Sequence, residues 1–128
     1  MDIEEVEIER YLEEVKRAVI SRNYRLERNS RRQENNDLFY EYLIDEEKVR
    51  QIILSLTVLD FSEKVRNRHR GFEHEWLYIF GKDVRLLRRF GTGSRVVPLY
   101  IKFNKLENNF VIVISFHEQN YELSYYFR

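Results

Sequence analysis

Apolar residues at the start of the chain recur at the spacing of a helix. Residues 3–21 are predicted to form one, because four apolar positions at spacings of four, three and four share one side: Ile8, Leu12, Val15 and Val19. A second helix is predicted from Asp45, whose carboxylate suits an N-cap, with an apolar face formed by Val49, Ile52, Ile53 and Leu56. Each helix therefore has one side that packs on another layer.

The segment between these two helices is more polar. Residues 24–28 alternate apolar and charged side chains, which predicts a short strand. Residues 31–37 are expected to form a loop, and residues 38–43 a helical turn that leads into the second helix.

From Leu59 onward the apolar pattern changes to the period of two that strands show. Phe61, Glu63 and Val65 are expected to share one side of a strand. Residues 76–80 are apolar at every position, which predicts a strand in the interior of a sheet.

Glycines separate the later strands. Gly81, Gly91 and Gly93 are expected to mark turns, with one more strand over residues 84–90. Residues 121–125 alternate weakly, which is compatible with a last edge strand.

The strongest pattern is a hairpin near the end of the chain. On its first strand the odd positions are apolar and expected to be buried: Val97, Leu99, Ile101 and Phe103. On its second strand the better apolar face is formed by Phe110, Ile112, Ile114 and Phe116. A two-residue turn at Asn108 and Asn109 sets the register. Counting outward gives two pairs on the opposite face: Lys102 with Ser115, and Tyr100 with His117.

This order of elements favours the α+β class, because two helices are followed by several strands with no helix between them. We expect two N-terminal helices packed on a mainly antiparallel β-sheet, in a single domain over residues 1–128.

The composition bears on the partners and the cellular location of the protein. Lys and Arg together number 22, as do Asp and Glu, so the net charge is zero and predicts no polyanionic partner. The absence of cysteine excludes disulfides and thiolate zinc sites. The first residues are acidic, and no stretch approaches the roughly 18 apolar residues of a membrane span. We therefore expect a cytoplasmic protein without a signal peptide.

The charges are segregated along the chain, which fits a neutral protein with a basic face as well as ordinary soluble loops. Basic residues gather in residues 22–32, 64–70 and 85–95. Candidate substrate contacts are three of the basic side chains and one aromatic side chain that would stack on a base: Lys64, Lys82, Arg85 and Tyr121. Packing of Tyr121 on the first helix is the alternative.

The polar face of the hairpin carries side chains suited to cleaving RNA. Attack of a ribose 2′-hydroxyl on its own phosphate needs a base, an acid for the departing 5′-oxygen and positive charge for the phosphorane. His117 is a candidate for either proton transfer, because histidine changes protonation near neutral pH. Tyr100 would donate a hydrogen bond or a proton, and Lys102 would stabilise the phosphate charge. Each of the three is also an ordinary residue of a solvated sheet face.

Two other motifs carry no prediction of chemistry. His69 and His74, with the neighbouring glutamates, match no standard ligand spacing, so we expect no metal and no cofactor. The Gly-x-Gly of residues 91–93 lacks the lysine of a phosphate loop and is read as a turn.

Five stretches support a family resemblance: IILSLTVLDF at residues 52–61, Trp76, FGK at 80–82, LYIK at 99–102 and ISFHE at 114–118. In order and spacing they resemble the motility quorum-sensing regulator (MqsR-type) toxins, from the first helix through Tyr125. The resemblance implies a RelE-like α+β fold and an mRNA interferase of a type II toxin–antitoxin system, neutralised by a cognate antitoxin protein.

The resemblance also bears on single residues. Tyr100 falls on a family tyrosine implicated in catalysis, and His117 falls where the best-known members have a lysine. A family lysine aligns with Glu63 or, with a shift of one residue, with Lys64. A family glutamine is replaced by Leu77, and residues 86–96 resemble an insertion.

The sequence thus predicts a metal-independent endoribonuclease acting on single-stranded mRNA, with His117, Tyr100 and Lys102 as its catalytic residues. Two alternatives stay open: a non-catalytic RNA-binding module, and a protein-interaction partner on the same scaffold.

Overall fold

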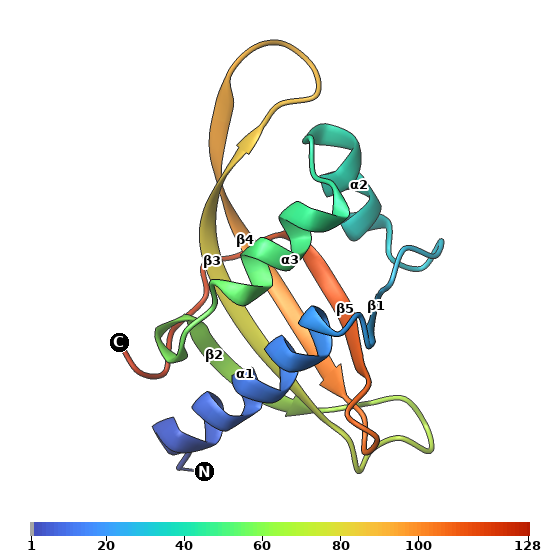
Figure 1. Cartoon of the computed structure of the whole chain (residues 1–128), viewed down its shortest axis with the longest axis vertical. Helices are drawn as coiled ribbons and strands as arrows, with labels where there is room; N and C mark the ends of the chain where they lie inside the picture. Colours follow the sequence, from blue (N-terminus) through green and yellow to red (C-terminus); the bar gives the residue numbers. More distant parts are fainter. Residues whose placement is uncertain (1) are drawn as a thin grey trace.

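A mixed five-stranded sheet forms the centre of the molecule (Figure 1). The computed structural model describes residues 2–128. Its elements in chain order are α1 (Glu5–Ile20), β1 (Tyr24–Leu26), α2 (Gln33–Glu41), α3 (Glu46–Leu54), a 3₁₀ turn (Val58–Asp60), β2 (Phe61–Arg66), β3 (Trp76–Leu87), β4 (Ser94–Lys105) and β5 (Val111–Glu118). Figure 1 shows α1 and α3 across one face of the sheet, with α2 beside the end of β5.

The strands lie in the order β1, β5, β4, β3, β2. β1 runs parallel to β5, and the other neighbours are antiparallel. The predicted α+β class is therefore confirmed, and the short strand predicted at residues 24–28 is the edge strand β1. The predicted number of helices was wrong, because residues 31–37 were expected to form a loop and instead contain the start of α2.

The predicted apolar faces of the first helix, the second helix and the first hairpin strand all belong to the core. Twelve of these positions are buried: Ile8, Leu12, Val15, Val19, Val49, Ile52, Ile53, Leu56, Val97, Leu99, Ile101 and Phe103. Burying a side chain of this size contributes about 1.5–3 kcal/mol relative to leaving it exposed. Asp45 caps α3 as predicted, because its carboxylate accepts a 2.8 Å hydrogen bond from the backbone N–H of Lys48. Within residues 2–128, no helix has the length and apolar character that crossing a membrane requires.

A bulge in β2 changes which side chains share a face. Phe61 pairs with Phe80, but Glu63 pairs with Ile79. Phe80 and Ile79 are neighbours in β3 and therefore point to opposite sides of the sheet. The expectation that Phe61 and Glu63 share one side was therefore wrong. Phe61 is buried in the core, and Glu63 lies exposed on the face opposite the helices.

β3 is longer than the glycine pattern predicts. Residues 76–80 and 84–90 were expected to be separate strands divided by a turn at Gly81, but β3 runs through Gly81 to Leu87. Gly91 and Gly93 do lie in the turn that follows, where both adopt positive φ.

The register of the β4–β5 hairpin is confirmed around its polar pairs, although not at its turn. Tyr100 lies opposite His117, and Lys102 lies opposite Ser115. The turn has three residues instead of two, because the backbone N–H of Leu106 bonds the carbonyl of Phe110. A bulge in β5 after Val113 compensates for the extra residue.

The same bulge overturns part of the predicted apolar face of β5. Val111 and Val113 are fully buried together with Phe116, whereas Ile112 and Ile114 are only partly buried. Strict alternation fails here because one extra residue, Ile114, reverses the facing of the strand.

Asn35 of α2 satisfies the backbone of this bulge. Its side-chain amide donates to the carbonyls of Ile114 at 3.0 Å and Glu27 at 2.9 Å, and its oxygen accepts from the N–H of Phe116 at 2.8 Å. Asn35 is 1% exposed, so each of these bonds is removed from water. The side chain takes the place of a neighbouring strand where β1 ends.

We expect Asn35→Ala to lower the free energy of unfolding by roughly 2–4 kcal/mol, because it leaves buried backbone donors and acceptors without partners. Urea denaturation followed by circular dichroism measures the change. Gln33→Ala, at an exposed position of the same helix, is the matched control and should cost about 0.5 kcal/mol or less. Equal losses in the two variants would contradict this role of Asn35.

The last ten residues, 119–128, form an irregular segment that we call the tail. The edge strand expected at residues 121–125 is absent from it. The tail crosses the sheet face opposite the helices, behind β4 and β3 in Figure 1, and ends beside β2. The backbone N–H of Gln119 donates to the carbonyl of Pro98 in β4, and the backbone N–H of Tyr126 donates to the carbonyl of Phe61 in β2. The tail therefore partly covers a sheet face that the helices leave open.

Candidate functional site

The polar residues of the hairpin line one pocket of about 340 Å³ on the open face of the sheet. We call it the hairpin pocket. β4 and β5 form its floor, the start of α2 forms one wall and the tail forms another. Its lining includes Arg31, Arg32, Glu34, Asn35, Tyr100, Lys102, Ser115, His117, Asn120 and Tyr121. The three predicted catalytic side chains thus lie together in the structure.

His117 is held in one orientation by its neighbours. Its ring stacks on that of Tyr100, with centroids 5.0 Å apart and planes 10° from parallel. Its Nδ1 lies 2.8 Å from the carbonyl oxygen of Glu118. Because a carbonyl oxygen only accepts, we assign the hydrogen to Nδ1, which leaves the Nε2 lone pair available in the neutral ring. Glu34 lies 3.5 Å from Nδ1 and suits a positively charged ring.

Tyr100 is a proton donor at neutral pH. Burial, the nearby Tyr121 hydroxyl and the carboxylates of Glu63 and Glu34 raise the pKa of Tyr100 to about 12. Its hydroxyl therefore keeps its proton and can donate a hydrogen bond, but it does not act as a base.

The hairpin pocket is rich in positive charge. Burial, followed by the charge of Arg32, lowers the pKa of Lys102 from its ordinary value of 10.5. Across residues 2–128, no carboxylate lies within ion-pair distance of Lys102, Arg31 or Arg32. Three side-chain cations that lack acidic partners therefore face one cavity, which favours an anionic ligand.

The predicted substrate contacts are dispersed. Tyr121 lines the hairpin pocket. Lys64 lies on the helix side of the sheet, where its ammonium bonds Glu7 at 2.9 Å. Arg85 lies on the far part of the β3–β4 hairpin and bonds Ser94. Lys82 lines a separate pocket.

Residues from α2 and the tail were missed by the sequence reasoning. Glu34, Asn35 and Asn120 all line the hairpin pocket. Glu34 and Asn35 lie in the segment expected to be a loop. Because Asn35 is polar but buried, it interrupts the apolar pattern that would have predicted the first turn of α2.

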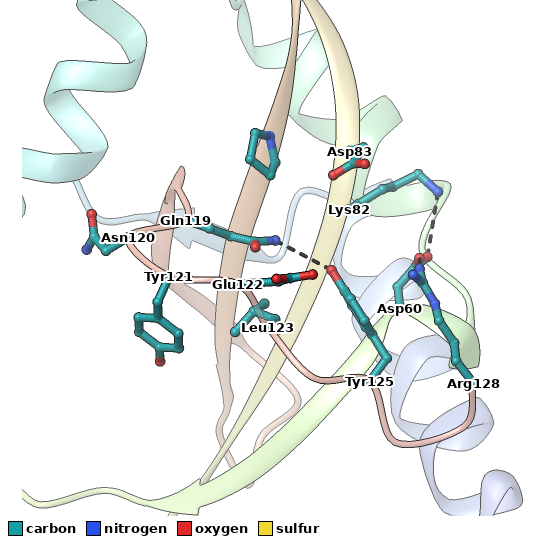
Figure 2. Close-up of a pocket in the computed structure, with 11 residues that line it drawn as sticks. Asp60, Lys82, Asp83, Gln119, Asn120, Tyr121, Glu122, Leu123, Tyr125 and Arg128 are labelled. Atoms are coloured by element: carbon teal, nitrogen blue, oxygen red, sulfur yellow. Dashed lines mark hydrogen bonds and ion pairs between the residues drawn. The ribbon is translucent and has the colours of Figure 1, made fainter.

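The separate pocket, which we call the tail pocket, has a volume of about 750 Å³ (Figure 2). Asp60 lies buried at one end, with its carboxylate 3.3 Å from Arg128 and 3.6 Å from Lys82. The other lining residues include Asp83, Pro98, Gln119, Asn120, Tyr121, Glu122, Leu123 and Tyr125. Asn120 and Tyr121 line both pockets, so the two cavities adjoin.

No group of three or more potential metal ligands gathers within the described residues 2–128. Comparison of the chain with protein-family models, curated proteins and solved structures finds no significant match.

Gly81 allows the tail to approach the sheet closely. A Cβ atom at this position would lie 2.4 Å from the hydroxyl of Tyr125, 2.7 Å from Leu123 and 2.9 Å from the Gln119 amide. All three contacts are side chains of the tail, so the tail packs where β3 has no side chain.

Gly81→Ala is expected to push the tail away from the sheet, because these distances are shorter than van der Waals contact. Hydrogen exchange of backbone amides in residues 119–126 should become faster, while exchange in α1 changes little. Gly71→Ala is a control in which the new Cβ meets no atom within 4 Å, although its positive φ makes some loss of stability expected. Unchanged exchange of the tail in Gly81→Ala would contradict this packing.

Proposed function

We propose that the protein is a toxin of a type II toxin–antitoxin system that cleaves single-stranded mRNA without a metal ion. One observation carries the proposal: His117, Tyr100 and Lys102 line a single pocket with two further cations that lack acidic partners. The family resemblance supports the same activity, a RelE-like relationship and a cognate antitoxin as partner.

In the proposed reaction, the ribose 2′-oxygen attacks the adjacent phosphorus while the bond from phosphorus to the 5′-oxygen breaks. Nε2 of His117 takes the proton of the 2′-hydroxyl. Tyr100 gives its proton to the departing 5′-oxygen, and solvent later returns a proton to Tyr100 and removes one from His117. The products are a 2′,3′-cyclic phosphate and a 5′-hydroxyl end.

Positive charge assists the same step. Lys102 and Arg32 line the pocket. In the proposed reaction they stabilise the extra negative charge of the phosphorane. Glu34 stabilises the imidazolium that forms when His117 accepts the proton. Base, acid and charge stabilisation are thus all supplied by side chains.

Purified protein should cleave a single-stranded RNA in the presence of EDTA, and His117→Ala should reduce the rate by at least about 100-fold, the usual contribution of a general base. Product ends can be identified by mass spectrometry. His69→Ala, in an exposed loop, is the matched control and should keep full activity. RNA binding without cleavage, or a rate that is flat between about pH 5 and pH 8, would contradict the assignment of His117.

Binding of the RNA backbone should weaken at alkaline pH sooner than an ordinary lysine would allow. A lysine loses its charge as the pH rises through its pKa, and burial lowers the pKa of Lys102. Affinity for a 2′-O-methyl oligonucleotide, which resists cleavage, is measured between about pH 7 and pH 10. Lys102→Arg should hold its affinity to higher pH, because a guanidinium stays charged.

Lys48→Arg, on α3 and outside the hairpin pocket, is the matched control and should follow the wild-type curve. Identical curves for all three proteins would show that Lys102 does not contact the backbone.

A non-catalytic RNA-binding module is the second candidate. It is favoured by Glu63, whose carboxylate lies near Tyr100 at the position where the resembling toxins have a lysine. Lys64 does not take over this role, because it points to the helix side of the sheet and bonds Glu7.

A further inference from the structure

The tail pocket adjoins the proposed cleavage site but has the opposite charge character. The two cations at its end, Lys82 and Arg128, both face the buried carboxylate of Asp60. Nearer the hairpin pocket, the exposed carboxylates of Asp83 and Glu122 make no ion pair or hydrogen bond with another residue of the described chain. Because water screens exposed charges, these carboxylates disfavour a phosphate only in their own vicinity, while the cations of the hairpin pocket attract it.

Hydrogen-bond acceptors converge on the tail pocket. Figure 2 shows the side chains of Asp83, Gln119 and Glu122 directed toward the same space. The amide nitrogen of Gln119 donates to the carbonyl of Leu99 and to the hydroxyl of Tyr125, which fixes the amide and leaves its oxygen as an acceptor. A ligand group that reaches these three acceptors must supply N–H or O–H donors.

The tail pocket also has an apolar part, which the ring of a ligand can contact. Pro98 lies directly across β3–β4 from Asp83, and Leu123 and Tyr125 close the cavity at the position of Gly81. Tyr121, at the border with the hairpin pocket, has an exposed ring on which a base can stack. Most of the lining is polar, so the apolar contacts of a ligand are limited to Pro98, Leu123 and the two tyrosine rings.

We infer that the tail pocket binds the nucleobase next to the cleaved bond, and that it selects bases with an exocyclic amino group against uracil. This inference rests on the proposed function. Asp83 and Glu122 accept hydrogen bonds from the amino groups of adenine, cytosine or guanine. Uracil has no amino group, and its one base donor, the N3–H, lies between two carbonyl oxygens that the carboxylates repel.

The test uses free nucleosides and the intact protein, so it requires no cleavage. Adenosine, cytidine and uridine are titrated into ¹⁵N-labelled protein, and amide shifts are followed by NMR. We expect shifts centred on residues 81–83 and 119–123, with adenosine and cytidine binding about five-fold or more tightly than uridine. Equal affinities, shifts confined to other residues, or no binding would each overturn the inference.

A pair of isosteric substitutions tests the carboxylates. The double variant Asp83→Asn and Glu122→Gln keeps the shape of both side chains but adds donors, so the preference against uridine should be lost. Glu13→Gln, at an exposed position of α1, is the matched control and should keep the preference. A retained preference in the double variant would overturn the assignment to Asp83 and Glu122.

The outcome for the tail pocket is separable from that for catalysis. Selective nucleoside binding by a protein that cleaves no RNA would reject the endoribonuclease but would support the tail pocket as a nucleobase site. Cleavage in EDTA with no nucleoside selectivity would support the endoribonuclease and reject the base site.

Discussion

One amide side chain, that of Asn35, determines how β5 faces the rest of the molecule. In a regular strand, Val111, Val113, Ser115 and His117 would all point to the same side. The bulge at Ile114 separates them, so the valines enter the core while Ser115 and His117 face the pocket. The bulge leaves backbone groups without a strand partner, and Asn35 supplies the missing hydrogen bonds. Core packing and the candidate site therefore depend on the same contact.

This contact also places α2. Because Asn35 is anchored to β5, the residues just before it lie over the open face of the sheet, where Arg31, Arg32 and Glu34 join the hairpin pocket. The charged wall of the pocket is thus a consequence of a structural hydrogen bond. The opposite wall depends on Gly81, where the missing side chain lets the tail pack on β3.

Much of the fold could be predicted from the sequence because burial follows a period. The faces of α1, α3 and β4 read correctly, and the hairpin brought Tyr100, Lys102 and His117 together as expected. The bulges could not be predicted, because one extra residue in β2 or β5 does not visibly change the pattern of apolar and polar positions. The predicted pairing of Tyr100 with His117 was right because two register shifts cancel: the turn is one residue longer than expected, and the β5 bulge adds one residue on the same strand. The start of α2 was missed because its buried position there is the amide Asn35, and the path of the tail was missed because its single buried apolar residue, Leu123, forms no apolar repeat.

The zero net charge of the chain conceals a division of charge between two adjoining cavities. The hairpin pocket holds three cations without acidic partners. The tail pocket holds two carboxylates without ion pairs, and its two cations face Asp60. A nucleotide has the same division, with charge on its phosphate and neutral donors on its base. Coulomb attraction alone would bind any anion in the hairpin pocket, in any orientation. An adjacent cavity that disfavours phosphate and accepts N–H donors would exclude most orientations of a bound nucleotide. Attack by a 2′-hydroxyl in line with the 5′-oxygen requires such a fixed orientation.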